Sequence, residues 1–103
     1  LWRVGITDFG VEHLAGLTKM EWLNLDNSQV SDLGLVHLKG MSKLKYLHLG
    51  STFVSDDGMQ HLAGLTTLED LKLTRTGVTE KGAAKLKEKL TETKIQLRYI
   101  EGE

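Results

Sequence analysis

Two spacings of hydrophobic residues alternate along this chain. Leu47 and Leu49 are separated by one polar residue, and this spacing of two predicts a half-buried strand. Leu35, Leu38 and Met41 follow one another at a spacing of three, which predicts one face of a helix. The pattern therefore predicts a short helix followed closely by a strand.

The alternation returns every 24 residues, with nothing inserted or deleted between the copies. A strand and a helix of this size cannot bury their apolar faces alone, so we expect the copies to stack on one shared core. The positions related by this step include Ile6, Val30, Val54 and Val78 before the helices, and Leu23, Leu47, Leu71 and Ile95 with Leu25, Leu49, Leu73 and Leu97 in the strands.

A hydroxyl residue followed by an acid stands before each predicted helix. We expect the hydroxyl to be an N-cap and the acid to lie near the positive end of its own helix. The predicted caps are Thr7, Ser31, Ser55 and Thr79. Glycines that recur after three of these helices are expected to stop them, and they are Gly16, Gly40 and Gly64.

The strand segments resemble the consensus of leucine-rich repeats. Residues 44–52 read Leu-x-x-Leu-x-Leu-x-x-Thr, residues 68–76 repeat this pattern, and residues 20–28 form a third copy that begins with Met and ends with Ser. The longer pattern, Val-Ser/Thr-Asp-x-Gly-φ-x-His-Leu-x-Gly-φ, resembles the cysteine-containing repeats of F-box proteins and, more closely, bacterial repeat proteins of planctomycete type. The consensus Asn or Cys is replaced here by hydroxyl residues that we expect to bond loop backbone, namely Ser28, Thr52 and Thr76.

The resemblance implies an α/β fold, a right-handed solenoid with a parallel sheet on the concave side and helices on the convex side. It also implies a non-catalytic module that binds a protein partner through the concave sheet and carries no cofactor or metal. We expect a final helix through residues 83–90 and a closing strand over residues 94–100. The whole of 1–103 is then one leucine-rich repeat domain, with a truncated first repeat at 1–5, full repeats at 6–29, 30–53 and 54–77, and a C-terminal capping repeat at 78–103.

The alternation along the strands also selects the expected binding residues. If the strand leucines point into the core, their neighbours point outward onto the concave surface. Trp22 and Tyr46 are then neighbours on adjacent strands, and exposed Trp and Tyr are frequent hot spots of interfaces. The predicted partner-binding residues are Trp22, Asn24, Asp26, Tyr46, His48, Asp70, Lys72, Lys94 and Arg98.

Composition narrows the function classes. The 103 residues contain no Cys, which excludes disulfides, thiol catalysis and Cys-ligated metal sites. No apolar run approaches the roughly 18 residues of a membrane helix. The net charge of -1 argues against a nucleic-acid partner, because such domains usually have a pI above roughly 9. Basic side chains outnumber acids in residues 72–98, which indicates a solvated face or, as an alternative, a site for an anionic partner.

Histidines offer two further candidate chemistries. His13, His37 and His61 recur on the helices, which pack roughly 8–10 Å apart, so they are too far apart to share an ion and are expected to be half-buried and bonded to carbonyls. His48 keeps open a nucleophilic triad with Asp26 and Ser51. No nucleophile turn or oxyanion-hole motif accompanies it, and we therefore expect no enzyme.

A structural or self-associating fragment is the alternative to a binding module. The truncated first repeat is expected to leave the apolar sides of Ile6, Val11 and Leu14 without a covering layer. Exposed apolar faces and strand edges recruit partners. This reading predicts a homo-oligomer formed through the N-terminal face.

Overall fold

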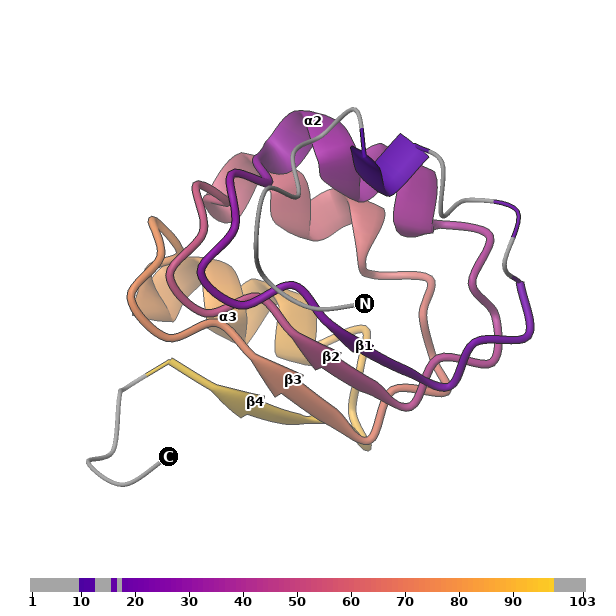
Figure 1. The fold of residues 1–103 in the computed structure, drawn as a ribbon. Coiled ribbons are helices and arrows are strands. Elements are labelled where there is room, and N and C mark those ends of the chain that lie inside the picture. Colours follow the sequence, from indigo (N-terminus) through magenta and orange to yellow (C-terminus); the bar gives the residue numbers. More distant parts are fainter. Residues whose placement is uncertain (1–9, 13–15, 17, 98–103) are drawn as a thin grey trace, which may run out of the picture.

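The structure is a computed structural model that describes residues 10–12, 16 and 18–97. Within these residues the chain forms a parallel sheet of four short strands in the order β1-β2-β3-β4 (Figure 1). The strands have the same length and follow one another at the 24-residue step of the sequence. Their bounds are Trp22–Asn24 for β1, Tyr46–His48 for β2, Asp70–Lys72 for β3 and Lys94–Gln96 for β4.

Helical segments connect consecutive strands and cover one face of the sheet (Figure 1). The first connection is α2, Asp32–Leu35, which continues as the 3-10 helix η1, Val36–Leu38. The second is the 3-10 helix η2, Asp56–His61, and the third is α3, Glu80–Lys87. Parallel neighbours need such crossover connections, and the α/β solenoid predicted from the repeats is confirmed.

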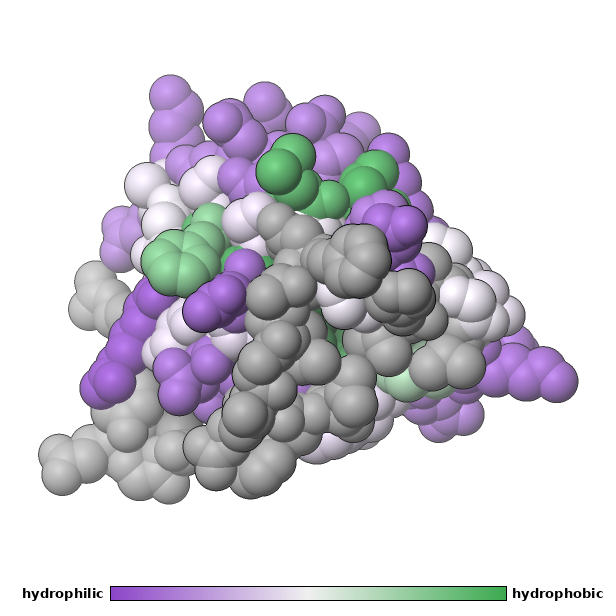
Figure 2. Space-filling model, turned by 45° about the horizontal axis from the view of Figure 1, so that its top comes forward, coloured by the Kyte–Doolittle hydropathy of each residue, from purple (hydrophilic) through white to green (hydrophobic). Residues whose placement is uncertain are grey.

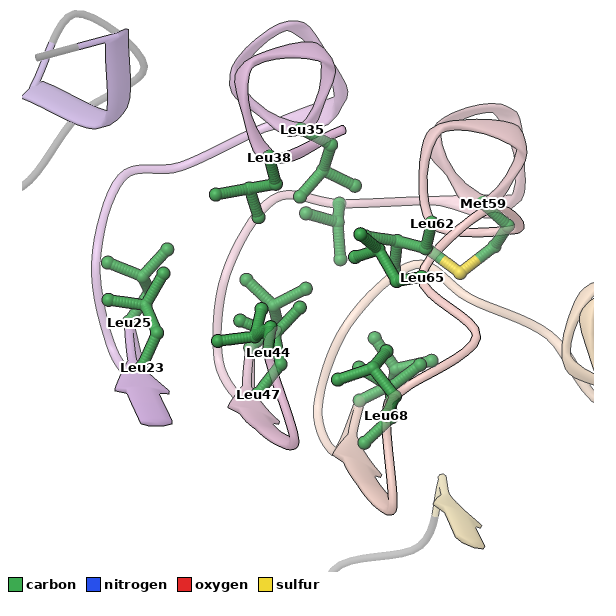
Figure 3. Packing of buried hydrophobic residues seen from close by; sticks show 14 of the residues in the cluster. Leu23, Leu25, Leu35, Leu38, Leu44, Leu47, Met59, Leu62, Leu65 and Leu68 are labelled. Carbon is green, nitrogen blue, oxygen red and sulfur yellow. The ribbon is translucent and has the colours of Figure 1, made fainter. Parts of the chain in front are cut away.

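The core lies between the sheet and the helices. The six strand leucines predicted to be buried, Leu23, Leu25, Leu47, Leu49, Leu71 and Leu73, are at most 2% exposed. Helix residues such as Leu35, Leu38, Met59 and Leu62 close the core from the other side (Figure 3). Parallel strands lie roughly 4.8 Å apart, whereas packed helices need roughly 8–10 Å, so the layer of helices is the wider one and the sheet is the concave side.

The register follows the sequence step without a slip. Leu23 pairs with Leu47, Leu47 with Leu71, and Leu71 with Ile95. A slip by one residue would turn every strand leucine out to solvent, so the apolar pattern fixes the pairing. The handedness of the solenoid stays a prediction.

The acids before the helices lie in the first turns of their own helices, as predicted, and two of them also bond the next repeat. The Asp32 carboxylate reaches the next repeat and accepts hydrogen bonds from the Ser55 amide at 2.7 Å and the Ser55 hydroxyl at 2.5 Å. Asp56 bonds Thr79 in the same way, at 2.8 Å to the amide and 2.6 Å to the hydroxyl. Each acid therefore ties one repeat to its C-terminal neighbour.

The caps themselves agree only in part with expectation. The side chains of Ser31 and Thr79 do accept from helix amides, whereas Ser55, whose hydroxyl donates to Asp32, makes no side-chain cap. Thr7 lies outside the described residues. The pKa of Asp56 lies below its usual value of 3.8. The main cause is the hydrogen bond from the Thr79 hydroxyl, followed by the hydrogen bond from the Thr79 backbone amide, and the charge of Lys81 adds to the effect.

Glycine makes room for each of these cross-repeat carboxylates. A Cβ atom at Gly58 would lie 2.2 Å from Asp32 Oδ1, and one at Gly82 would lie 2.0 Å from Asp56 Oδ1. No side chain fits at such distances. The recurring Ser/Thr-Asp-x-Gly pattern is thus a lock between repeats, in which the acid of one unit sits against the hydroxyl and the glycine of the next.

The turns after the strands also repeat. Asn27, Ser51 and Arg75 occupy the same repeat position and all adopt the left-handed conformation, with φ near 55–57°. The hydroxyls expected to bond loop backbone do so here: Thr52 donates to the Leu49 carbonyl at 2.7 Å and Thr76 to the Leu73 carbonyl at 2.8 Å. Ser28 at the corresponding position is buried, and its hydroxyl accepts from the Val30 amide.

Three sequence predictions about helix and strand ends need adjustment. The last helix, Glu80–Lys87, begins directly after its predicted cap Thr79 but ends before Leu90, the last residue of the predicted 83–90, although Leu90 is still buried in the core. The closing strand is Lys94–Gln96, and residues 98–100 lie outside the described part. The first two helical connections end before Gly40 and Gly64, which lie in turns with unstrained backbone.

None of the helices in the described part of the chain is long and apolar enough to cross a membrane.

Candidate functional site

The outer surface of the sheet carries the side chains that the strand alternation turns away from the core. Trp22 is 56% exposed and Tyr46 is 42% exposed, while Leu23 and Leu47 beside them are almost completely buried. The predicted orientation of the two aromatic residues is confirmed. Both stand at the first position of their strands and are paired in register, Trp22 with Tyr46.

Two rows of side chains cross the concave face. The first positions of the strands form the row Trp22, Tyr46, Asp70 and Lys94, and the third positions form the row Asn24, His48, Lys72 and Gln96. An open hollow of about 240 Å³ lies on this face over the first three strands. Its lining consists of Trp22, Leu23, Asn24, Tyr46, Leu47, His48, Asp70 and Lys72.

The row of first positions changes from aromatic to charged along the sheet. Tyr46 donates its hydroxyl hydrogen bond to Glu69 Oε1 at 3.4 Å. Asp70 follows Tyr46 in register, and its Oδ1 atom is buried with no hydrogen-bond partner in the described part of the chain. Lys94 stands next to Asp70 on β4 and is exposed. The aromatic pair therefore lies beside a carboxylate whose buried oxygen lacks a donor.

The row of third positions is held by short local contacts. Asn24 Oδ1 accepts from the Asp26 amide at 2.9 Å. His48 Nδ1 accepts from the Gly50 amide at 3.1 Å and lies 3.8 Å from Asp26 Oδ1. Nδ1 accepts the hydrogen bond from Gly50 only while it carries no proton, and it forms an ion pair with Asp26 only when the ring is protonated.

This tautomer does not match a catalytic triad. In a triad the acid accepts from a protonated Nδ1, whereas here Nδ1 is itself the acceptor. Ser51 lies in a left-handed turn and its amide donates to the Thr74 carbonyl. A Cβ atom at Gly50 would approach His48, Thr74 and Asp26 at 2.7–3.1 Å, so glycine is what lets these three side chains share the end of the sheet.

The remaining predicted site residues fall in three groups. Lys72 is partly buried at the third position of β3, and Asp26 is partly buried in the turn after β1, beside His48. Arg98 lies outside the described residues, as does His13. His37 and His61 are half-buried on the helical side as predicted, but His61 Nδ1 has no hydrogen-bond partner within the described residues, so the expected carbonyl bond is not made by this atom.

Metal ligation finds no support on the described surface. In the ranges 10–12, 16 and 18–97 there is no group of three or more His, Asp or Glu side chains that could hold an ion. His37 and His61 lie in successive helical segments, η1 and η2.

The helical side holds features that the sequence reasoning did not single out. A groove of about 630 Å³ separates η2 from α3, with Asp56, Asp57 and Glu88 next to Lys81, Lys85 and Lys89. Both signs of charge are interspersed there, so the basic residues of the last repeat make no single-sign surface at this groove. Leu33, which is 78% exposed, and Val36 add apolar surface on the first helical connection. Figure 2 brings the top of Figure 1, where α2 lies, toward the viewer and shows hydrophobic patches among hydrophilic ones there.

Known proteins supply an independent comparison. The leucine rich repeat family matches residues 18–78, which is more than half of the chain. No curated protein sequence matches the chain. Among solved structures, actin-binding site 2 of leiomodin-1 is similar with a TM-score of 0.63 at 16% identity, over 96% of this chain and 70% of that one.

An internalin from Listeria monocytogenes, inlF, is similar with a TM-score of 0.58 at 21% identity. The match covers 91% of this chain and 32% of the internalin, so the chain spans about a third of that protein. Identities this low speak for the fold alone, and the fold they share is the stacked strand and helix described above. Since the family match covers most of the repeats, the chain belongs to the leucine-rich repeat family.

Proposed function

We propose that this chain is a non-catalytic protein-interaction module that binds its partner through the concave face of the sheet. Trp22 and Tyr46 are the central contacts, and the surrounding contacts come from Asn24, Asp26, His48, Asp70, Lys72, Lys94 and Arg98. Leucine-rich repeat domains generally mediate protein–protein interactions.

One observation carries the proposal. Trp22 and Tyr46 are side by side on neighbouring strands and remain exposed, although large aromatic side chains gain most from burial. A protein that leaves such a pair on a rigid sheet exposes the residue types most often found at hot spots. The similar leiomodin-1 structure is itself described as an actin-binding site, which supports a binding role for this fold.

The size of the face limits the affinity. The outward positions of the four strands are far fewer than the roughly 20–30 residues that each side of a stable interface contributes. We therefore expect weak binding by this face alone, with affinity concentrated at the aromatic pair.

The test is capture of a partner from a lysate of the source organism by the immobilised chain. Trp22→Ala and Tyr46→Ala should each lower the amount captured, because each removes a central contact. Leu33→Ala is the matched control, since it removes an exposed apolar side chain from the helical side. If Leu33→Ala abolishes capture while both aromatic variants leave it unchanged, the binding face is on the other side of the molecule.

Finer features of the resemblance belong to the same proposal. We assign the repeats to the cysteine-containing or planctomycete type, on the strength of the 24-residue step and the Ser/Thr-Asp-x-Gly pattern. The division into full repeats at 6–29, 30–53 and 54–77, with a capping repeat at 78–103, is part of this assignment.

Self-association through the N-terminal face stays a prediction, but one of the three residues on which it was based is not exposed. Val11 was expected on an uncovered apolar side, but it is completely buried. Ile6 and Leu14 lie outside the described residues. Sedimentation that detects a dimer at high protein concentration would favour this reading.

A further inference from the structure

We propose that the aromatic end of the concave face binds the guanidinium group of an arginine side chain presented by the protein partner, with Asp70 as its counter-charge. This inference rests on the proposed function and names the chemistry of the partner. The site consists of Trp22, Tyr46 and Asp70, and we call it the aromatic–acid site.

The three residues are consecutive in one row of the sheet. Trp22 is in register with Tyr46, and Tyr46 with Asp70. Neighbouring strands lie roughly 4.8 Å apart, so a flat group that contacts the Asp70 carboxylate also reaches the Tyr46 ring, and Trp22 one strand further contacts the side chain that carries this group. All three residues line the same open hollow on the concave face.

Asp70 needs a donor that the described chain does not supply. Its Oδ1 atom is buried and has no hydrogen-bond partner within the described residues. A carboxylate oxygen removed from water without a donor is unfavourable, and a bound cation that donates hydrogen bonds would remove this cost. Lys94 stands in register with Asp70, but no ion pair joins them in the described structure.

The aromatic pair favours the same kind of ligand. The faces of Trp and Tyr attract cations, and Trp is the strongest of the three aromatic residues in this respect. Glu69 accepts the hydroxyl hydrogen bond of Tyr46, so a second carboxylate lies at the edge of the site. Two aromatic rings and two acids lie at this end of the face, and the basic side chains next to them are Lys72, which lines the same hollow in the row of third positions, and Lys94 beside Asp70.

Arginine fits the row better than lysine. A guanidinium is flat, stacks on aromatic rings and donates several hydrogen bonds in a fixed plane, whereas an ammonium is compact and strongly hydrated. The ligand of this site must contact aromatic rings and a carboxylate oxygen that lie in one row. The flat guanidinium of arginine can do so better than the compact ammonium of lysine.

The experiment titrates the whole chain with short blocked peptides, observed by the indole N–H signals in two-dimensional NMR. The probes are acetyl-Gly-Arg-Gly-amide, the same peptide with citrulline, which is flat but uncharged, and the same peptide with lysine. The chain has two Trp residues, so comparison with Trp22→Phe assigns the Trp22 signal.

The arginine peptide should shift the Trp22 signal saturably with a dissociation constant in the millimolar range. Asp70→Asn should weaken this binding about five-fold, which corresponds to the loss of a charge pair worth about 1 kcal/mol. Asp57→Asn on the helical side is the matched control and should change nothing. Lys94→Gln should tighten the binding, because it removes a like charge from the edge of the site.

Several results would overturn the inference. These are equal shifts with the citrulline peptide, equal affinity for the lysine peptide, unchanged binding in Asp70→Asn, and absence of any shift up to the solubility of the arginine peptide. The proposed function is tested separately by partner capture. If Trp22→Ala lowers capture while Asp70→Asn does not, the concave face binds the partner without arginine recognition; if neither variant lowers capture, the proposed function itself fails.

Discussion

Asp32→Ala is the perturbation that tests the lock between repeats most directly. The substitution removes a carboxylate that belongs to α2 but bonds only the next repeat, through the amide and the hydroxyl of Ser55. The two bonds, at 2.7 and 2.5 Å, are the short distances typical of charge-assisted hydrogen bonds. No apolar core residue changes, so the loss contains the lock and the interaction of Asp32 with the first turn of its own helix.

The magnitude follows from what each bond contributes. A hydrogen bond to a charged group contributes about 1.5–3 kcal/mol to stability, and truncation that leaves a buried donor unpaired costs more than truncation at the surface. Asp32 and Ser55 are both half-buried, so water replaces part of what is lost. We expect the pair of bonds to account for about 2–3 kcal/mol, a large fraction of the 5–15 kcal/mol typical of a whole domain.

The assay is urea unfolding followed by circular dichroism, with the free energy extrapolated to water. The midpoint should fall while the slope stays constant, because the unfolded state exposes the same surface. Asp32→Asn keeps one acceptor for the Ser55 amide and should lose about half as much. Asp57→Ala is the matched control, since it removes an exposed acid from a helix start for which no cross-repeat bond is present.

A double-mutant cycle separates the contact from other effects of the substitution. Ser55→Ala combined with Asp32→Ala should lose less than the sum of the two single variants, by about 1 kcal/mol, because both remove the same hydroxyl bond. If Asp32→Ala destabilises no more than Asp57→Ala, or if the two losses simply add, the acid does not hold the repeats together and this reasoning is wrong.

Three further predictions concern the core, the glycine of the lock and the effect of pH. Leu47→Ala should lower the unfolding free energy by about 2–5 kcal/mol, whereas Lys45→Ala on the surface should change it by less than about 0.5 kcal/mol in the same urea assay. Gly58→Ala should destabilise the folded chain strongly, since its Cβ would lie 2.2 Å from a carboxylate oxygen. Gly40→Ala should not, because no atom lies within 4 Å of the added Cβ, and thermal melts of the two variants check this difference. Because the pKa of Asp56 is lowered in the folded state, its ionised form stabilises the fold at pH values above the usual pKa of 3.8. This contribution disappears as the pH falls through the lower pKa of the folded state. The difference in urea midpoint between the natural chain and Asp56→Asn should therefore be present at pH 7 and shrink below pH ~4.

The fold was predictable because every level of the sequence agrees. A step of 24 residues without insertions sets the pairing register, and the two apolar spacings set the alternation of strand and helix. The burial of Leu23, Leu47 and Leu71 then follows from strand geometry, because any other register would expose them together. The lengths of the helices did not follow, since the apolar spacing of three is shared by α and 3-10 helices.

The lock between repeats was missed for a definite physical reason. A hydroxyl residue followed by an acid is the signature of a helix start, and the Ser31 side chain does cap its own helix. The partner of the acid lies 23 residues further on, in the neighbouring unit, where only the stacked structure brings it close. The signal in the sequence was the glycine three residues after each hydroxyl residue, because an invariant small residue inside a helix indicates close approach of another group.

The candidate site was predictable in outline but not in its chemistry. Alternation predicted that Trp22, Tyr46 and Asp70 share the outer face, and the register places them in one row. That a single oxygen of Asp70 is buried without a donor depends on how neighbouring side chains cover it, which no spacing in the sequence encodes.

Differences among the repeats locate function in this chain, just as identities among them locate stability. The positions that point into the core hold leucine in each of the first three strands, and the lock positions hold aspartate in two successive repeats. The outward row instead reads Trp22, Tyr46, Asp70 and Lys94, four different side chains on one unchanging backbone. Packing constrains the residues at the inner positions but not those at the outer positions. Unlike residues can therefore follow one another along the outer row and match a partner. Their order, from aromatic to acidic to basic, makes the two ends of the concave face chemically different. The proposed function therefore requires a partner that presents its own groups in the matching order along the row.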